Sequence, residues 1–257
     1  MLPLLRDKAV IALCRDRVIA VRWHKGRVAA KVVLPVSGGV VSSLSSLLAG
    51  EEFRNTDATV ILSNHFMYFS VMPWNGAFLS GEEEMALAQH RFNETYGEAT
   101  AWAIRQSKGV VGAPTLVSAV AKDFLESITE FFASSGIKLK SIQPYLMAAF
   151  NACRKKLPKE PAWFVLAEPG IFCIALLRDG QWHRIRQLKS TGLDEALLAL
   201  EREALLCEED AGREVYLYAP ENPEWIAASG VWSMHALEMP SLSDILDAEY
   251  VMTAVGA

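Results

Sequence analysis

An internal repeat constrains the fold of this 257-residue chain more than any other feature. Alignment of Gly26 with Gly180 gives an offset of 180 − 26 = 154, and no gap is then needed. Each copy has two apolar runs followed by a two-residue turn that contains glycine, a pattern that predicts β-hairpins. The matching segments are 10–13 with 164–167, 18–21 with 172–175, and Lys25-Gly26 with Asp179-Gly180. We therefore predict a three-stranded meander over 9–34 and again over 163–188.

The segments that follow each meander predict the same order of elements, a helix and then a strand. After the first copy these are a helix over 40–49 and strands over 59–62 and 67–71. After the second they are a helix over 192–211, with Thr191 as N-cap and Gly212 as terminator, and strands over 214–218 and 231–237. Two copies of a mixed α/β unit account for both halves.

The middle of the chain is predicted to be mainly helical. Ser80 and Glu83 have capping-box spacing, so a helix should begin there and end at Gly97. Apolar residues at 3–4 spacing predict a long helix over 115–135. Three further elements are a strand over 100–105, a strand over 137–142, and a helix from Pro144 to about Leu157. The basic, proline-bearing stretch 154–161 is interpreted as a hinge between the halves.

Composition excludes several classes of protein. The chain is 51% hydrophobic and has a net charge of −5, which argues against disorder and against broad binding to nucleic acid. The four cysteines are far apart and form no CxxC pair, so we expect free thiols in a reducing compartment. The five histidines have no metal-binding spacing, so no metal site is predicted. No apolar run is long enough to span a bilayer.

Duplicated meander-first units joined by a hinge resemble the actin/Hsp70/sugar-kinase superfamily, whose halves are ribonuclease H-like. Several segments, in order along the chain, more closely resemble the PilM-like family of type IV pilus assembly. That family is related to the cytoplasmic domain of the type II secretion L component and to the mannose-sensitive haemagglutinin I component. The segments are Val71–Trp74, Ser118–Lys122, Phe124–Ile137, Ser141–Pro144 and Ala148–Asn151.

The resemblance implies an α/β, actin-like fold of duplicated mixed-sheet units with an inserted helical segment. We predict a first half over 1–157, with the insertion at about 75–110, and a second half over 158–257. It also implies a cytoplasmic scaffold at the inner membrane, held there by a partner. That partner would be the cytoplasmic tail of a bitopic, PilN-like membrane protein, bound by extended-chain pairing and apolar pockets.

Active members of the superfamily bind ATP and Mg²⁺ between two glycine-containing turns. The equivalent first turn here is Cys14–Arg17, with Arg15, Asp16 and Arg17 but no glycine. The second keeps Glu168 and Gly170 but places Pro169, which has no N–H, between them. The third element, 219–222, also lacks glycine. We therefore predict no catalytic residues and no bound ATP, and we interpret Arg15 and Arg17 as hairpin residues that are solvated or pair with Glu168.

Two alternatives remain open. The chain could be a divergent ATPase or small-molecule kinase, in which Arg15 and Arg17 bind phosphate by charge. Trp74, Trp225 and Trp232 lie at element ends or in turns, where aromatic side chains often anchor a protein partner. These three are our partner-binding candidates. The second alternative is that the same side chains form the contact surface of a homodimer. Packing in the core explains the three tryptophans equally well.

Overall fold

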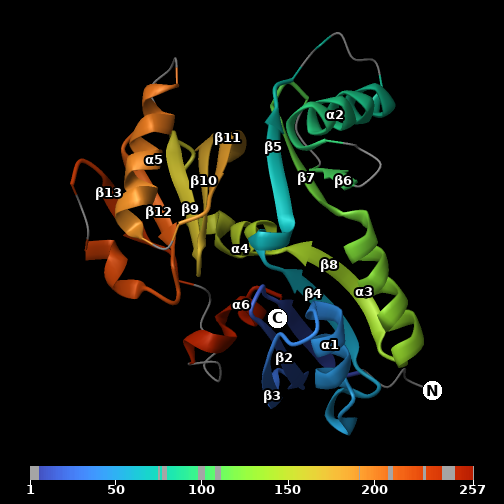
Figure 1. The fold of residues 1–257 in the computed structure, drawn as a ribbon. Coiled ribbons are helices and arrows are strands. Elements are labelled where there is room, and N and C mark those ends of the chain that lie inside the picture. The colour runs from blue at the N-terminus through green and yellow to red at the C-terminus, as the bar shows by residue number, and fades with distance from the viewer. Residues whose placement is uncertain are drawn as a thin grey trace. The chain divides into compact units, whose positions relative to one another are not determined.

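A computed structural model describes residues 6–74, 76, 80–97, 102–107, 111–190, 192–207, 211–227, 230–238 and 247–256. The chain divides into two compact units, each assembled from separate segments (Figure 1). Unit 1 consists of Met1–Phe66, Asp123–Ala152 and Met239–Ala257. Unit 2 consists of Met67–Lys122 and Cys153–Glu238.

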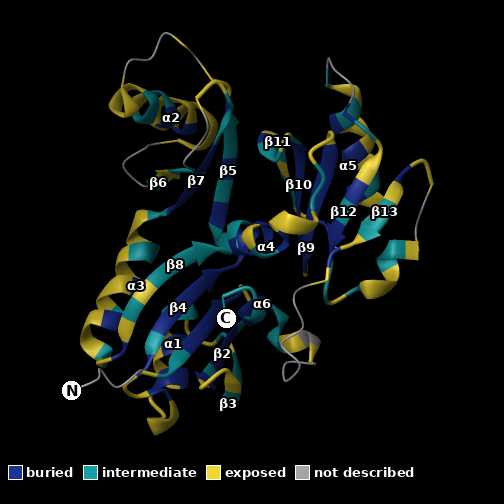
Figure 2. Ribbon diagram, turned by 180° about the vertical axis from the view of Figure 1, so that it is seen from behind, coloured by how far each residue is buried: buried dark blue, intermediate teal, exposed yellow. Residues whose placement is uncertain are grey.

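Unit 1 is built on a five-stranded sheet with the order β3-β2-β1-β4-β8. β1 runs antiparallel to β2 and parallel to β4, and β8 extends the parallel part. Nearly every residue of β1 and β4 is buried, as expected of central strands covered on both faces (Figure 2). The strands are β1 (Lys8–Leu13), β2 (Arg17–His24), β3 (Arg27–Pro35), β4 (Asp57–Leu62) and β8 (Lys138–Pro144).

Four α-helices accompany this sheet in the described part of the chain. They are α1 (Val40–Leu48), α3 (Lys122–Ser135), α4 (Tyr145–Cys153) and α6 (Val251–Ala254). α1 packs on β2 and β3, while α6, from the far end of the sequence, packs on β1. The buried side chain of Asn64 accepts a hydrogen bond from the Leu146 N–H (3.2 Å) and so holds the start of α4.

Unit 2 contains a second five-stranded sheet, with the order β11-β10-β9-β12-β13. Its strands are β9 (Ala162–Glu168), β10 (Ile171–Arg178), β11 (Gln181–Leu188), β12 (Glu214–Tyr218) and β13 (Ser233–Ala236). Helix α5 (Leu193–Leu205) buries Ala196 and Leu200 in the same core as Trp163 and Phe172 of the sheet. The buried carboxylate of Glu203 on α5 pairs with Arg184 on β11.

The two five-stranded sheets confirm the repeat, and the three strands of their meanders begin 154 residues apart. The bounds of β2 shifted by 154 are those of β10, and β1 and β9 begin 154 residues apart. Both hairpins turn on left-handed residue pairs, Lys25-Gly26 and Asp179-Gly180. A β-bulge even falls at matching positions, between residues 22 and 23 and between 176 and 177. The prediction of duplicated mixed-sheet units is thus confirmed.

Unit 2 also contains a three-stranded antiparallel sheet with the order β5-β7-β6. Its strands are β5 (Met67–Met72), β7 (Thr115–Ala121) and β6 (Trp102–Gln106). Helix α2 (Gly81–Tyr96) begins at the predicted capping box, in which Glu83 N–H donates to Ser80 Oγ and Ser80 N–H donates to Glu83 Oε2. Ala88 and Phe92 of α2 pack against Val117 and Ala119 of β7.

Short 3-10 helices complete the described structure: η1 (Glu51–Phe53), η2 (Asn64–Phe66), η4 (Arg154–Lys156), η5 (Pro223–Ala227) and η6 (Ala248–Tyr250). The helix predicted from Pro144 to Leu157 is therefore an α-helix that ends at Cys153 and continues as η4.

Two predicted helices were partly wrong. Residues 115–121, predicted as the start of a helix, form β7, because an apolar run of this length suits either structure and here it becomes the central strand of a sheet. The helix predicted to reach residue 211 ends at Leu205. Acidic residues 208–210 follow it, and negative charge at a helix C-terminus opposes the helix dipole. Thr191, its predicted N-cap, lies outside the described residues.

The predicted halves, 1–157 and 158–257, stay a prediction. The compact units group segments by packing, and both are discontinuous in sequence. Of the insertion predicted at about 75–110, the structure describes α2 and β6, and both belong to unit 2.

Candidate functional site

The first predicted phosphate turn lies between β1 and β2. It is closed by a hydrogen bond from Cys14 N–H to Arg17 O (2.9 Å), so that backbone donor is already used. Arg15 and Asp16 are exposed, and neither adopts a left-handed backbone. The Arg17 guanidinium lies 3.7 Å from the Asp16 carboxylate. The turn thus carries a local ion pair, and one of its backbone donors, the Cys14 N–H, is used within the turn itself.

The second turn, between β9 and β10, keeps more of the expected geometry. Gly170 has a φ of 81°, a backbone conformation that favours glycine, and its carbonyl accepts from Ser190 N–H (3.2 Å). Pro169, beside it, offers no N–H donor. Glu168 ends β9 and is buried, and its charge, after burial itself, helps to raise the pKa of the neighbouring Cys173 thiol well above its usual value.

The third element, residues 219–222, turns the chain from β12 into η5. Asn222 N–H donates to Ala219 O, and Trp225 N–H then donates to Asn222 O. The indole of Trp225 stacks on Phe172, two residues after Gly170, with the ring centroids 5.4 Å apart. Ala219 of this element and Trp225 after it both pack against the core of unit 2.

The three tryptophans predicted to bind a partner lie in different environments. Trp74, after β5, is 51% exposed. Trp225 is half-buried against Phe172, and Trp232 is buried in the core of unit 2. The structure does not bring the three together into one exposed cluster, and partner binding by any of them stays a prediction.

A cluster of aromatic side chains that the sequence reasoning did not select lies at the three-stranded sheet. Tyr68 on β5 contacts both Tyr96 at the end of α2 and Trp102 on β6, with ring centroids 4.7 and 4.6 Å apart. Tyr96 is 40% exposed, while Tyr68 and Trp102 are half-buried. Burial and the neighbouring Tyr68 raise the pKa of Tyr96, which keeps its hydroxyl protonated as a hydrogen-bond donor. The sequence feature that could have indicated this cluster is Tyr96, an aromatic residue directly before Gly97, where the helix ends.

This cluster lies beside an open strand edge. β7 pairs with one edge of β6, and no strand pairs with its other edge within the part of the chain that the structure describes. Ser107 N–H donates to Leu116 O of the neighbouring segment (2.8 Å). Because donors alternate along an antiparallel strand, the N–H groups of Ile104 and Gln106 point away from β7. The edge can therefore accept an added strand.

Comparison with known proteins supports the fold. A scan against protein-family models finds no match, and a search of the curated proteins finds none either. Among solved structures, a PilM-PilN type IV pilus biogenesis complex matches with a TM-score of 0.67 at 10% identity, covering 97% of this chain and 96% of that one. The cytoplasmic domain of EpsL, from the type II secretion system of Vibrio cholerae, matches with a TM-score of 0.61 at 10% identity, covering 98% and 95%.

A Bacteroides thetaiotaomicron protein with an actin-like ATPase fold and unknown function matches with a TM-score of 0.62 at 9% identity, over 91% of each chain. The fold is actin-like. Identities near 10% establish the fold alone, and at that level they confirm the resemblance to the PilM-like group.

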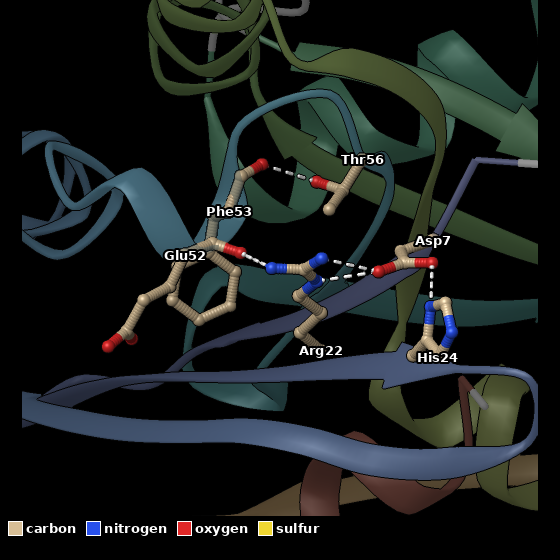
Figure 3. A network of polar contacts seen from close by, with 6 residues as sticks. All are labelled: Asp7, Arg22, His24, Glu52, Phe53 and Thr56. Carbon is tan, nitrogen blue, oxygen red and sulfur yellow. Dashed lines mark hydrogen bonds and ion pairs between the residues drawn. The ribbon is translucent and has the colours of Figure 1, made fainter.

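A polar network lies at the end of β1 and β2 opposite the first turn (Figure 3). Asp7 accepts hydrogen bonds from Arg22 Nε (2.7 Å) and lies 2.7 Å from His24 Nδ1. Burial opposes ionisation of Asp7, but these hydrogen bonds outweigh it and lower its pKa. Arg22 also donates to Glu52 O (2.6 Å). The network ties β2 to Asp7, which precedes β1, and to η1, which precedes β4.

Among the described residues, the features of a metal site, a reactive cysteine and a membrane-spanning helix are all absent. No three His, Cys, Asp or Glu residues there are placed to hold a metal ion. Burial raises the pKa of Cys153 and Cys173, so both stay thiols and not nucleophilic thiolates. None of the described helices is both long and apolar enough to cross a membrane.

Proposed function

We propose that this chain is a non-catalytic, actin-like scaffold of a pilus or secretion platform. It acts at the cytoplasmic face of the inner membrane and binds the cytoplasmic tail of a bitopic, PilN-like protein. A solved PilM-PilN complex and the cytoplasmic domain of an inner-membrane secretion component share the fold, which supports this choice of partner and location.

The observation that carries the proposal is a contrast within the repeat. The strands of the two meanders begin 154 residues apart and their β-bulges match, whereas the turns that would bind phosphate are not maintained. Arg15 and Asp16 occupy one turn and Pro169 the other. A protein that keeps the strands of this fold but lacks its nucleotide-binding turns is suited to bind another protein as a scaffold.

The edge of β6 with which no described strand pairs is the surface we assign to the tail. An extended peptide that adds to this edge would receive hydrogen bonds from the Ile104 and Gln106 N–H groups. The half-exposed rings of Tyr96 and Trp102 lie beside it and would provide apolar contact for alternate side chains of the peptide.

Isothermal titration of the full chain with a synthetic tail of the PilN-like protein tests both the function and the surface. We expect saturable binding. Gln106→Pro removes an outward N–H but leaves the bonds to β7 in place, and edge strands tolerate proline. It should weaken binding about tenfold, equivalent to roughly 1.4 kcal/mol. Gln106→Ala is the matched control and should bind like the wild type.

The outcomes separate the two parts of the proposal. If the tail does not bind, the function is wrong. If it binds equally well to Gln106→Pro, the function survives but the β6 surface is wrong. The alternative function, an ATPase or kinase, is tested by a thermal shift with millimolar Mg-ATP. We expect the melting temperature to stay unchanged, whereas a nucleotide bound well below that concentration would raise it by stabilising the native state.

A further inference from the structure

The outer side of helix α5 carries leucine at positions where a surface helix normally carries polar residues. α5 buries Ala196 and Leu200 in the core of unit 2, but it also has exposed stretches along its length (Figure 2). Leu198 is 66% exposed and Leu205 is 87% exposed. Because an α-helix turns about 100° per residue, these two side chains differ in direction by only about 20° and point about 140–160° away from Leu200. Single exposed leucines are ordinary, whereas two aligned along one helix form an apolar stripe.

Two opposite charges flank this stripe. Glu201 and Arg202 are both exposed and stand between Leu198 and Leu205 in the sequence. By the same helical geometry, Glu201 lies on one side of the line that joins the leucines and Arg202 lies on the other. Neither charged side chain has an ion-pair or hydrogen-bond partner among the described residues. The exposed face of α5 therefore has an apolar centre, a negative side and a positive side.

The sequence of this face is nearly the same when it is read in either direction. Residues 197–206 are Leu-Leu-Ala-Leu-Glu-Arg-Glu-Ala-Leu-Leu, with the midpoint between Glu201 and Arg202. In a two-fold symmetric dimer, the residue that faces a given position is itself faced by that position in the other copy. An antiparallel pair of α5 helices with its axis at the midpoint places Leu198 of each copy opposite Leu205 of the other.

Charge complementarity selects a second copy of this chain as the partner. The same axis places Glu201 of each copy opposite Arg202 of the other, so two ion pairs flank the leucines. A parallel pair of the same helices would instead place each charge beside its own kind. α5 thus carries both halves of an antiparallel interface, and a separate partner helix is not needed to complete it.

We propose that this protein forms a two-fold symmetric dimer in which α5 packs antiparallel on α5 of a second copy. Leu198 and Leu205 form the apolar centre of the interface, and Glu201 and Arg202 set its direction. A contact centred on one pair of helices is smaller than a standard interface, so we expect a reversible dimer with a Kd of about 10–100 μM. None of these residues belongs to the β6 edge, so the inference stands whether or not the membrane tail binds there.

Sedimentation equilibrium of the full chain at about 5–500 μM tests the dimer. We expect the wild type to change from monomer to dimer across this range. Leu198→Lys and Leu205→Lys each place an ammonium group against an apolar side chain of the other copy, and each should weaken dimerisation at least about tenfold. Val111→Lys is the matched control, because Val111 is 90% exposed and lies outside α5, and it should dimerise like the wild type. Circular dichroism checks that the lysine variants stay folded.

Charge reversal tests the identity of the partner and the direction of the helices. Glu201→Arg and Arg202→Glu each place like charges opposite one another at two points of the interface, and each alone should dimerise about tenfold more weakly than the wild type. An equimolar mixture of these two variants restores both ion pairs in a mixed dimer. At the same total concentration, the mixture should therefore contain more dimer than either variant does alone.

Several results would overturn the proposal. The first is a wild type that stays monomeric up to about 500 μM. The second is a dimer that withstands both lysine substitutions in α5, because another surface must then form it. The third is a mixture of the two charge variants that dimerises no better than the variants do separately. In that case Glu201 does not face Arg202 of a second copy, and the antiparallel pairing is wrong.

Discussion

The five-stranded sheets of the two units share a meander, but they lead into their fourth strands under different constraints. Two residues before β4 stands Asn55, with a φ of 59°, and two residues before β12 stands Gly212, with a φ of 67°. Both residues have a left-handed φ, but their surroundings differ. Asn55 is exposed, whereas a Cβ on Gly212 would lie 2.4 Å from the carbonyl oxygen of Pro161.

The comparison teaches that duplication preserves backbone geometry, and that local packing then decides which residues each copy tolerates. The same holds at the phosphate turns. The first is made without any left-handed residue and the second needs Gly170 at a φ of 81°. Strand order, hairpin and bulge are matched, and the residues between them have diverged with their neighbours.

The largest effect is expected where the two copies differ in crowding. Gly212→Ala places a Cβ against a backbone carbonyl that cannot move aside, and it should cost more than about 2 kcal/mol in the free energy of unfolding. Asn55→Gly, at the matching position of the first sheet, should change stability by less than about 1 kcal/mol. Urea unfolding of both variants measures this, and equal costs would show that crowding at Gly212 does not matter.

A middle-sized effect is expected from the polar network that ties the first meander to its fourth strand. Asp7→Asn removes the charge that Arg22 and His24 bind, and should cost about 1.5–3 kcal/mol near pH 7. Because the folded-state pKa of Asp7 is lowered, its contribution is full above the unfolded-state pKa and disappears as the pH falls through the lower, folded value.

The stabilities of wild type and Asp7→Asn should therefore converge on acidification below about pH 4, near the ordinary pKa of aspartate. Asp16→Asn, an exposed carboxylate on the first turn of the same sheet, is the control and should stay near wild type throughout. A gap between wild type and Asp7→Asn that stays constant with pH would contradict the assigned role of the charge.

The smallest effect is expected at the matched hairpin turns. Lys25 adopts a φ of 50° and Asp179 a φ of 51°. Asn and Asp accept this conformation more readily than lysine does, so Lys25→Asn should stabilise the protein by a few tenths of a kcal/mol, up to about 1. Asp179→Lys should lose a similar amount. Thermal unfolding of the pair tests whether the two turns are energetically equivalent.

Most of the fold could be predicted because the elements of the repeat are indicated by short-range sequence patterns. Glycine-containing hairpin turns and apolar runs fixed the meanders, and Ser80 with Glu83 fixed the start of α2. The strand character of 115–121 could not be predicted, because its two neighbours in the sheet, β5 and β6, lie at other places in the sequence. A short apolar run does not show which distant strands it will pair with.

Less of the candidate functional site could be predicted from the sequence. The departures of the phosphate turns at Arg15 and Pro169 are readable directly, because glycine and proline carry their backbone chemistry with them. The burial of Trp232 and the cluster of Tyr68, Tyr96 and Trp102 are not, because both depend on side chains that meet only after folding.

The return of α6 to β1 has a consequence for how the chain is made. Met252 lies against Cys14, 238 residues earlier, and Gly256 has so little space that a Cβ would come within 2.8 Å of Val10. A polypeptide leaves the ribosome N-terminus first, so Cys14, directly after β1, emerges 238 residues ahead of the Met252 side chain that covers it. The sheet of unit 1 therefore lacks this cover until α6 has been translated, and β1 needs protection from other contacts during that interval.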